Sequence, residues 1–124
     1  MAEKTYVWFS IRIRSHEPMI TICSRVSQVL GCRFTVGHDS ALGDVQIMDA
    51  EVMCLQLRIS QWQFYGDATE WVYQLKGESV IEPRWDYSAE IDLTAWMLME
   101  FREQDSTEWY VPTIEELRNE AGID

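Results

Sequence analysis

The sequence has few cysteines, few basic residues and no long apolar run. Its three cysteines, Cys23, Cys32 and Cys54, share no paired spacing, so neither a disulfide framework nor a zinc site is predicted. The longest apolar run, around residues 96–99, is far shorter than the ~20 residues that cross a bilayer. The first residues also lack a basic segment followed by an apolar stretch. These absences predict a cytoplasmic protein.

The length and composition are those of one globular domain. The chain has 124 residues, of which 47% are hydrophobic and 25% charged. Domains usually contain ~100–200 residues, so we expect a single domain over residues 1–124. This composition also excludes intrinsic disorder as the general state of the chain.

Basic residues are scarce, and the resulting negative charge is unevenly distributed. The chain has 10 Lys and Arg against 21 Asp and Glu, a net charge of −11. Residues 1–65 contain six of each sign, whereas residues 66–124 contain four basic and fifteen acidic side chains. Such a balance disfavours binding to nucleic acid or anionic lipid and favours attraction of basic partners. Solubility alone also accounts for an acidic surface.

The first half of the chain predicts strands and one helix. Alternating apolar residues predict a strand over 5–14, and helical spacing after a capping segment predicts a helix over 17–30. A short strand at 32–36 and the glycine-bounded loop 37–43 predict a hairpin. Its return strand begins near Asp44, and a further extended stretch reaches Trp62 or Phe64, without a readable break between them.

Residues 67–77 are predicted to form a short helix. Asp67 and Glu70 have the spacing of a capping box, and Gly77 is suited to a helix end. The apolar residues between them recur at helical spacing: Ala68, Trp71, Val72 and Leu75.

The last third is predicted to contain a hairpin and a terminal helix. Residues 90–102 fit a strand better than a helix, because most of their apolar side chains alternate. A turn at 104–107 would join this strand to a partner at 108–111. The capping box at 113–116 then begins a short helix ending at 121–122.

The predicted order is strand, helix, strand, strand, helix, strand, followed by the extra elements. This order indicates an α+β fold with an antiparallel sheet and helices packed on one face. A ferredoxin-like core plus a C-terminal hairpin and short helix is compatible with it. The opposite sheet face would carry Trp8 and other amphipathic side chains.

The sequence contains no motif for a metal, a cofactor or catalysis. The candidate metal ligands lack the spacing of known sites: His16, Cys23, Cys32 and His38. Its loop glycines do not form a phosphate-binding motif. His38 beside Asp39 is the one pair suited to acid–base chemistry, but an ordinary loop explains it as well. We therefore predict no enzyme activity, no metal and no cofactor.

Aromatic residues lie beside acidic ones in the second half of the chain. Tyrosine and tryptophan are enriched among the interface residues that contribute most of the binding free energy, and carboxylates orient a basic partner. Large aromatics also fill the centre of small domains. The candidate partner-binding residues are Trp85, Asp86, Tyr87, Glu90, Asp105, Glu108, Trp109 and Tyr110.

Small size, strong acidity, aromatic–acidic clusters and the lack of a catalytic motif together resemble immunity proteins of bacterial polymorphic or contact-dependent toxin systems. The resemblance is one of overall character and matches no particular family. It implies a protein that binds a cognate toxin, often a basic nuclease, and blocks its active surface. The residues alone predict a binding module for a basic protein surface.

Three other functions remain open. One is a phage-type DNA mimic that inhibits a defence complex, which needs carboxylates in rows. Another is a sensor domain with an apolar pocket for a small molecule. The third is a small enzyme that uses His38 and Asp39.

Overall fold

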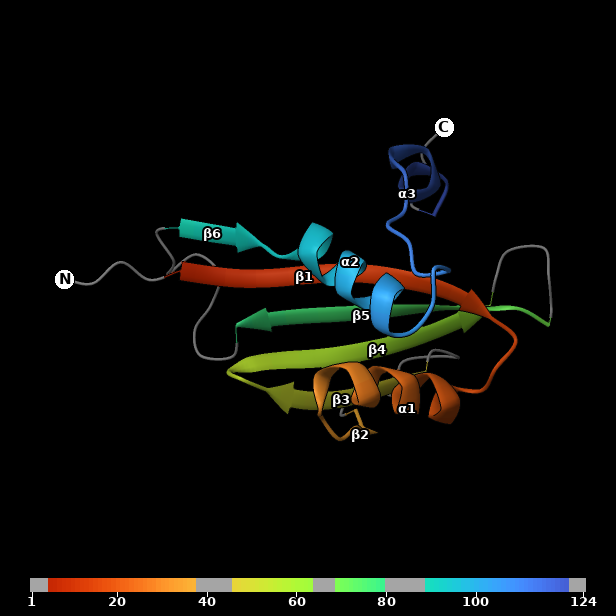
Figure 1. Cartoon of the computed structure of the whole chain (residues 1–124). Coiled ribbons are helices and arrows are strands. Elements are labelled where there is room, and N and C mark those ends of the chain that lie inside the picture. The colour runs from red at the N-terminus through yellow and green to blue at the C-terminus, as the bar shows by residue number, and fades with distance from the viewer. Residues whose placement is uncertain (1–4, 38–45, 64–68, 80–88, 121–124) are drawn as a thin grey trace.

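A computed structural model describes residues 5–37, 46–63, 69–79 and 89–120. The chain has an α+β fold with a mostly antiparallel sheet, as predicted, and the strand order is β2-β3-β4-β5-β1-β6. Figure 1 shows α1 and α2 on the same face of this sheet. The elements are β1 (Thr5–Ser15), α1 (Met19–Leu30), β2 (Thr35–Val36), β3 (Gln46–Val52), β4 (Leu55–Gln63), β5 (Trp71–Ser79), β6 (Ala89–Asp92), α2 (Thr94–Gln104) and α3 (Ile114–Glu120).

The core lies between the helices and the sheet. β1 contributes Phe9, Ile11 and Ile13, which are fully buried and alternate along the strand as predicted. The helices cover these side chains with buried apolar residues one helical turn apart, Ile22 and Val26 from α1 and Met97 and Phe101 from α2. Burial of this apolar area is the main force that holds helices and sheet together.

The first half of the chain matches the prediction closely. The strand β1 and the helix α1 form at the predicted places, and β2 pairs with β3 as a hairpin whose loop lies largely outside the described residues. The break between β3 and β4 falls at Met53 and Cys54, which have φ values of 47° and 67°. Two successive residues with positive φ suit a two-residue hairpin turn.

The predicted helix at 67–77 is wrong, because residues 71–79 form the strand β5. Leu75 pairs with Ile11 on one side and Ile59 on the other, so its place is fixed by neighbouring strands. Gly77, predicted to end the helix, lies within β5. A Cβ atom there would collide with the ring of Phe9, so glycine lets that ring lie directly over the strand. Tertiary pairing overrides the local helical spacing.

The favoured strand at 90–102 is also wrong for most of its length. Only its first three residues are extended, as part of β6, which pairs in parallel with the start of β1. The Asp92 carboxylate accepts a hydrogen bond from the Thr94 backbone N–H at 2.8 Å, at the point where α2 begins. α2 buries Met97 and Phe101, which lie one helical turn apart. Burial of these two side chains on one face favours the helix over the strand.

Neither the C-terminal hairpin nor the ferredoxin-like order is formed. The predicted strand at 108–111 is reduced to one bridge between Tyr110 and Arg12. β3, β4 and β5 instead form an antiparallel meander, and β5 returns to pair with β1. The second helix of a ferredoxin-like core is absent from its expected place, because residues 71–79 are a strand.

The capping box of the last helix is confirmed. Thr113 Oγ1 accepts a hydrogen bond from the Glu116 backbone N–H at 3.1 Å, and Glu116 Oε1 accepts one from the Thr113 N–H at 3.5 Å. The predicted end of this helix at 121–122 lies outside the described residues. Within the part of the chain described, no helix is long and apolar enough to span a membrane.

Candidate functional site

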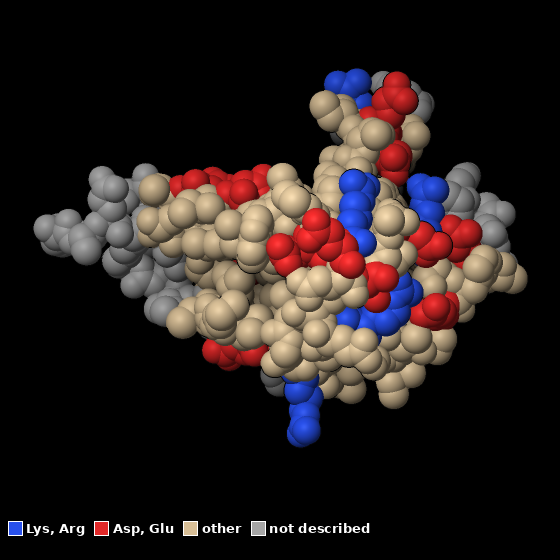
Figure 2. All heavy atoms as spheres, in the orientation of Figure 1, with Lys and Arg blue, Asp and Glu red and all other residues tan. Residues whose placement is uncertain are grey.

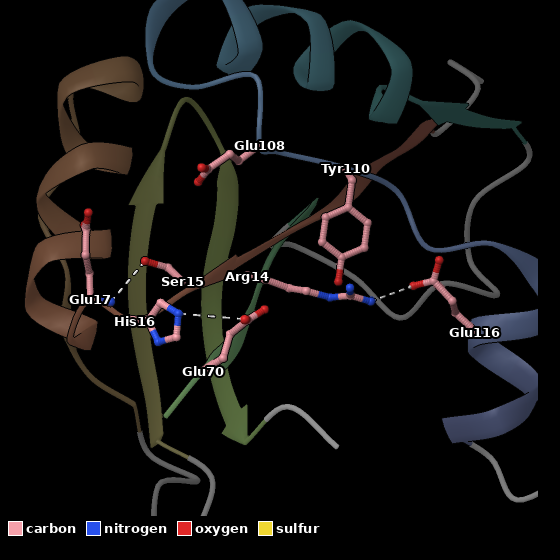
Figure 3. A pocket seen from close by; sticks show the side chains of 8 residues that line it. All are labelled: Arg14, Ser15, His16, Glu17, Glu70, Glu108, Tyr110 and Glu116. Carbon is pink, nitrogen blue, oxygen red and sulfur yellow. Dashed lines mark hydrogen bonds and ion pairs between the residues drawn. The ribbon is translucent and has the colours of Figure 1, made fainter. Parts of the chain in front are cut away.

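A hollow of about 650 Å³ opens at the C-terminal end of β1. We call it the acidic hollow, because four of its eight lining residues are glutamates (Figure 3). Its residues come from the end of β1, the turn after β1, the position before β5, the segment between α2 and α3, and α3 itself. They are Arg14, Ser15, His16, Glu17, Glu70, Glu108, Tyr110 and Glu116.

One wall of the acidic hollow is built on the edge of β1. Arg12 and Tyr110 exchange two backbone hydrogen bonds of 2.8 Å, which fixes Tyr110 beside the strand. The guanidinium of Arg14 lies 5.3 Å from the centroid of the Tyr110 ring, within the range of a cation–π contact. Arg14 Nη2 also lies 3.4 Å from Glu116 Oε2. Arg14 therefore compensates one of the four carboxylates.

The turn that follows β1 is held from inside the protein. The Tyr73 hydroxyl donates to the Glu17 carbonyl at 2.5 Å and accepts a hydrogen bond from Gln61 Nε2 at 2.7 Å. Burial raises the pKa of Tyr73, so the hydroxyl keeps its proton. Ser15 Oγ accepts a further bond from the Glu17 N–H at 3.0 Å. These bonds fix the backbone on which His16 and Glu17 are placed.

His16 is an exposed part of the rim. Its Nδ1 lies 2.8 Å from the carbonyl oxygen of Thr69, so this nitrogen carries the hydrogen that is donated. Its Nε2 lies 3.9 Å from Glu70 Oε2, which is too long for a hydrogen bond. The pair therefore lacks the geometry that would orient a catalytic histidine, while Glu70 keeps an oxygen directed to the acidic hollow.

A second wall, which continues from Tyr110 to Glu108, is fixed by a junction between α1 and the segment after α2. Arg25 donates to both carboxylate oxygens of Asp105 at 2.8–3.1 Å, and the Trp109 indole donates to the same carboxylate at 2.7 Å. Burial by itself raises the pKa of Asp105, but the hydrogen bonds from Arg25 and Trp109 outweigh it and hold this pKa below its usual value. The junction places Glu108 and Tyr110, on either side of Trp109, at the acidic hollow.

The balance of charge in the acidic hollow is negative. Glu17 forms an ion pair of 3.3 Å with Arg25 Nη1, and Arg25 does not line the acidic hollow. Glu116 forms an ion pair with Arg14, which does line it. Glu108 is exposed and has no ion pair among the residues the structure describes. Figure 2 shows charged side chains of both signs close together over the face of the molecule that carries α1 and α2. A cation entering the acidic hollow would meet more carboxylates than guanidinium groups.

The predicted partner-binding residues are divided between surface and core. Glu108 and Tyr110 line the acidic hollow. Asp105 lies at its edge and is occupied by Arg25. Glu90 is exposed on β6 and is not among the lining residues. Trp85, Asp86 and Tyr87 lie outside the described residues.

Trp109 is a correction to the predicted contact surface. Its side chain has 0% exposure and packs edge-on against Phe101, with ring centroids 4.9 Å apart. A tryptophan in this place fills the core, and its indole N–H organises Asp105. Its neighbours in sequence lie nearer the surface: Glu108 belongs to a turn and is exposed, and Tyr110 is half-buried beside β1.

Sequence reasoning missed most of the acidic hollow. Glu17, Glu70 and Glu116 lie far apart along the chain, and no local spacing connects them. The available signal was the polar segment between the first strand and the first helix, where a sheet end and a helix start commonly place exposed side chains. The lining residues that are not among the predicted partner-binding residues are Arg14, Ser15, His16, Glu17, Glu70 and Glu116.

The described residues of this region offer charged and aromatic groups around one concavity. No group of three or more His, Cys, Asp or Glu within the described ranges is arranged to hold a metal ion. The chain matches no protein-family model, no curated protein and no solved structure. What the arrangement offers is a fixed, acidic concavity with an aromatic wall, which suits a guanidinium or ammonium group.

Proposed function

We propose that this protein is an inhibitor of a basic partner protein, of the kind that toxin-immunity proteins represent. It binds its partner by accepting cationic side chains into the acidic hollow. The observation that carries the proposal is the convergence of Glu17, Glu70, Glu108 and Glu116 on one concavity that contains one arginine.

The local geometry supports recognition of a positively charged side chain. Carboxylates bind a guanidinium through two parallel hydrogen bonds, and the ring of Tyr110 already packs against one guanidinium, that of Arg14. Tyr73 and Asp105 hold the two walls in place before a partner arrives. A site formed in advance loses less conformational entropy on binding.

The excess of negative charge supports an inhibitory role. A nuclease attracts phosphate through basic residues, and an acidic protein seated on those residues would compete with the substrate. Long-range attraction also speeds the encounter, by ~10–1,000-fold at low salt. A DNA mimic would instead need rows of carboxylates, whereas the four glutamates here gather around one hollow. This arrangement favours recognition of individual side chains.

The test is capture of the partner with tagged full-length protein and two charge-reversal variants. Glu108→Lys changes the charge of the acidic hollow. Glu51→Lys makes the same change on β3, beside the turn at the other end of the sheet. We expect the wild type and Glu51→Lys to retain one basic protein at ~0.15 M salt, and Glu108→Lys to bind it at least ~10-fold more weakly.

An activity assay of the captured protein tests the inhibitory role. Its own activity, measured with purified components, should fall as wild-type protein is added and recover with Glu108→Lys. Equal binding by all three forms would remove the acidic hollow from the interface. Capture of no basic protein would contradict the proposed function.

A further inference from the structure

The helix α3 exposes apolar side chains beside the acidic hollow. Figure 1 shows it projecting from the rest of the fold, and its seven residues begin directly after the capping Thr113. Ile114 is 70% exposed, Leu117 45% and the preceding Val111 44%. None of the three belongs to the hydrophobic core or to the residues packed against it. The apolar side of α3 is therefore uncovered in the isolated chain.

One contact of α3 with the sheet is a polar one, between Glu116 and Arg14. Glu116 reaches Arg14 across 3.4 Å, with side chains that remain 35% and 41% exposed. An exposed ion pair of this kind contributes at most about 1 kcal/mol. Helices as short as α3 depend on packing of an apolar side for their stability. Among the described residues, α3 thus buries none of its apolar side chains fully.

A second copy of this chain is a poor occupant for that side. In a twofold dimer the same surface meets itself, so the acidic hollow and the first turn of α3, with Glu115 and Glu116, would face identical negative charge. The net charge of −11 adds to that repulsion. Charge complementarity favours a basic partner instead.

Glu116 connects the apolar side of α3 to the acidic hollow. It lines the hollow, while Leu117 is the next residue of the same helix. Successive helical residues point about 100° apart. A surface that reaches both must therefore offer positive and apolar side chains next to one another.

We propose that α3 and the acidic hollow form one composite interface for a basic amphipathic segment of a partner protein. A cationic side chain of that segment enters the acidic hollow, and its apolar side packs on Ile114 and Leu117. The inference rests on the proposed function and adds the chemistry of the partner. Binding would supply the apolar contacts that α3 lacks in the isolated chain.

The experiment selects ligands for the full-length protein from a phage-displayed library of random 16-residue peptides. Enriched peptides are then synthesised with a fluorophore, and their binding is measured by anisotropy. The test variant Ile114→Gln/Leu117→Gln removes the apolar side and keeps residues that favour helix. The matched control is Met53→Gln, which removes an 84% exposed side chain from the turn at the opposite end of the sheet.

We expect peptides with two or more Arg or Lys and a pair of apolar residues at helical spacing. The double variant should bind them ~10–100-fold more weakly, as expected for losing two apolar contacts, and Met53→Gln should bind them as the wild type does. Far-UV circular dichroism and thermal unfolding show whether the double variant keeps the fold. If it does not, Leu117→Gln alone should still weaken binding in a folded protein.

Two negative results are distinguishable. Enriched basic peptides that lack apolar residues, or that bind the double variant normally, would overturn the composite interface and leave the proposed function standing. Failure to enrich basic peptides would overturn both. Where basic peptides are enriched, their binding to Glu108→Lys reports independently whether the acidic hollow takes part.

Discussion

Two arginine–carboxylate pairs connect the N-terminal part of this protein to its C-terminal third, and they differ in almost every physical respect. Arg25 and Asp105 have side chains only 19% and 14% exposed, with a shortest contact of 2.8 Å. Arg14 and Glu116 are 41% and 35% exposed and 3.4 Å apart. The first pair is bidentate and receives an additional hydrogen bond from Trp109. The second is a single contact at the surface.

The inner pair, Arg25 and Asp105, holds its segment more firmly than the outer pair, Arg14 and Glu116. Water screens the outer pair, while the inner pair is partly removed from solvent and its groups would be costly to leave unpaired. Asp105 therefore determines where Trp109 and the wall of the acidic hollow lie. The ion pair between Glu116 of α3 and Arg14 contributes less to holding its segment in place.

The largest expected effect comes from breaking the inner pair. Asp105→Ala leaves the guanidinium of Arg25 and the indole N–H of Trp109 without their acceptor, so we expect a loss of about 2–4 kcal/mol in the free energy of unfolding. The unfolding temperature should fall by roughly 10 °C. Asp105→Asn, which keeps one oxygen as an acceptor, should lose less. A loss below about 1 kcal/mol for the alanine variant would show that the junction does not hold this wall.

The pH dependence of the same pair has a defined sign. Because the pKa of Asp105 is lowered in the folded protein, the unfolded chain takes up the proton first as pH falls. Its contribution to stability is fully present above the ordinary carboxyl pKa of about 4 and is lost as pH falls through the lower folded value. The stability difference between wild type and Asp105→Asn, from urea unfolding, should be constant at pH 5–7 and shrink below about pH 4. A difference that grew on acidification would reverse this assignment.

A smaller loss of stability is expected when the hydrogen bond that supports the turn after β1 is removed. Tyr73→Phe removes the hydroxyl that lies between Gln61 and the Glu17 carbonyl, at an expected cost of about 1–2 kcal/mol. Amide hydrogen exchange should also accelerate at His16 and Glu17. Tyr6→Phe is the matched control, because it removes a hydroxyl that donates to Glu78, nearer the other end of the sheet. Exchange at the turn should be unchanged in that control.

The outer pair should produce the smallest change. Glu116→Gln is expected to lower the free energy of unfolding by less than about 1 kcal/mol. The difference from wild type should become smaller still at ~0.5 M salt, because exposed charges are then screened. An effect as large as that of Asp105→Ala would show that the two attachments are equivalent and that α3 is fixed.

The elements predicted correctly are those with sufficient local information. β1 has one apolar face, so its alternation is unambiguous. The last helix begins with Thr113 and Glu116, whose reciprocal hydrogen bonds are made within one turn. In both cases the residues that decide the structure are close together in the sequence.

Residues 71–79 and 94–104 were assigned the wrong element for a common reason. The apolar residues of β5 fit a helical stripe, but Val72 and Tyr73 are buried on opposite faces of a sheet. In α2 most apolar residues alternate, yet Trp96 and Met99 remain exposed while Met97 and Phe101 are buried. Hydrophobic spacing is ambiguous when partners far away in sequence supply the burial.

Two residues that line the acidic hollow are among the predicted partner-binding residues, and the other six are not. Glu108 and Tyr110 belong to a local aromatic–acidic cluster, which made them candidates. Glu70 and Glu116 have no such local signal and meet these residues only through the pairing of β1 with β5 and with Tyr110. Trp109 belonged to the same cluster and was placed in the core.

The sequence by itself determined the α+β class, the first strand and helix, the capped last helix and the excess of negative charge, because composition and short-range hydrogen bonding are properties of neighbouring residues. Only the tertiary structure decided that 71–79 is a strand, that α2 is a helix and that four glutamates share one hollow. These outcomes depend on which distant segments bury one another's apolar surface. That burial free energy is a property of the folded chain as a whole.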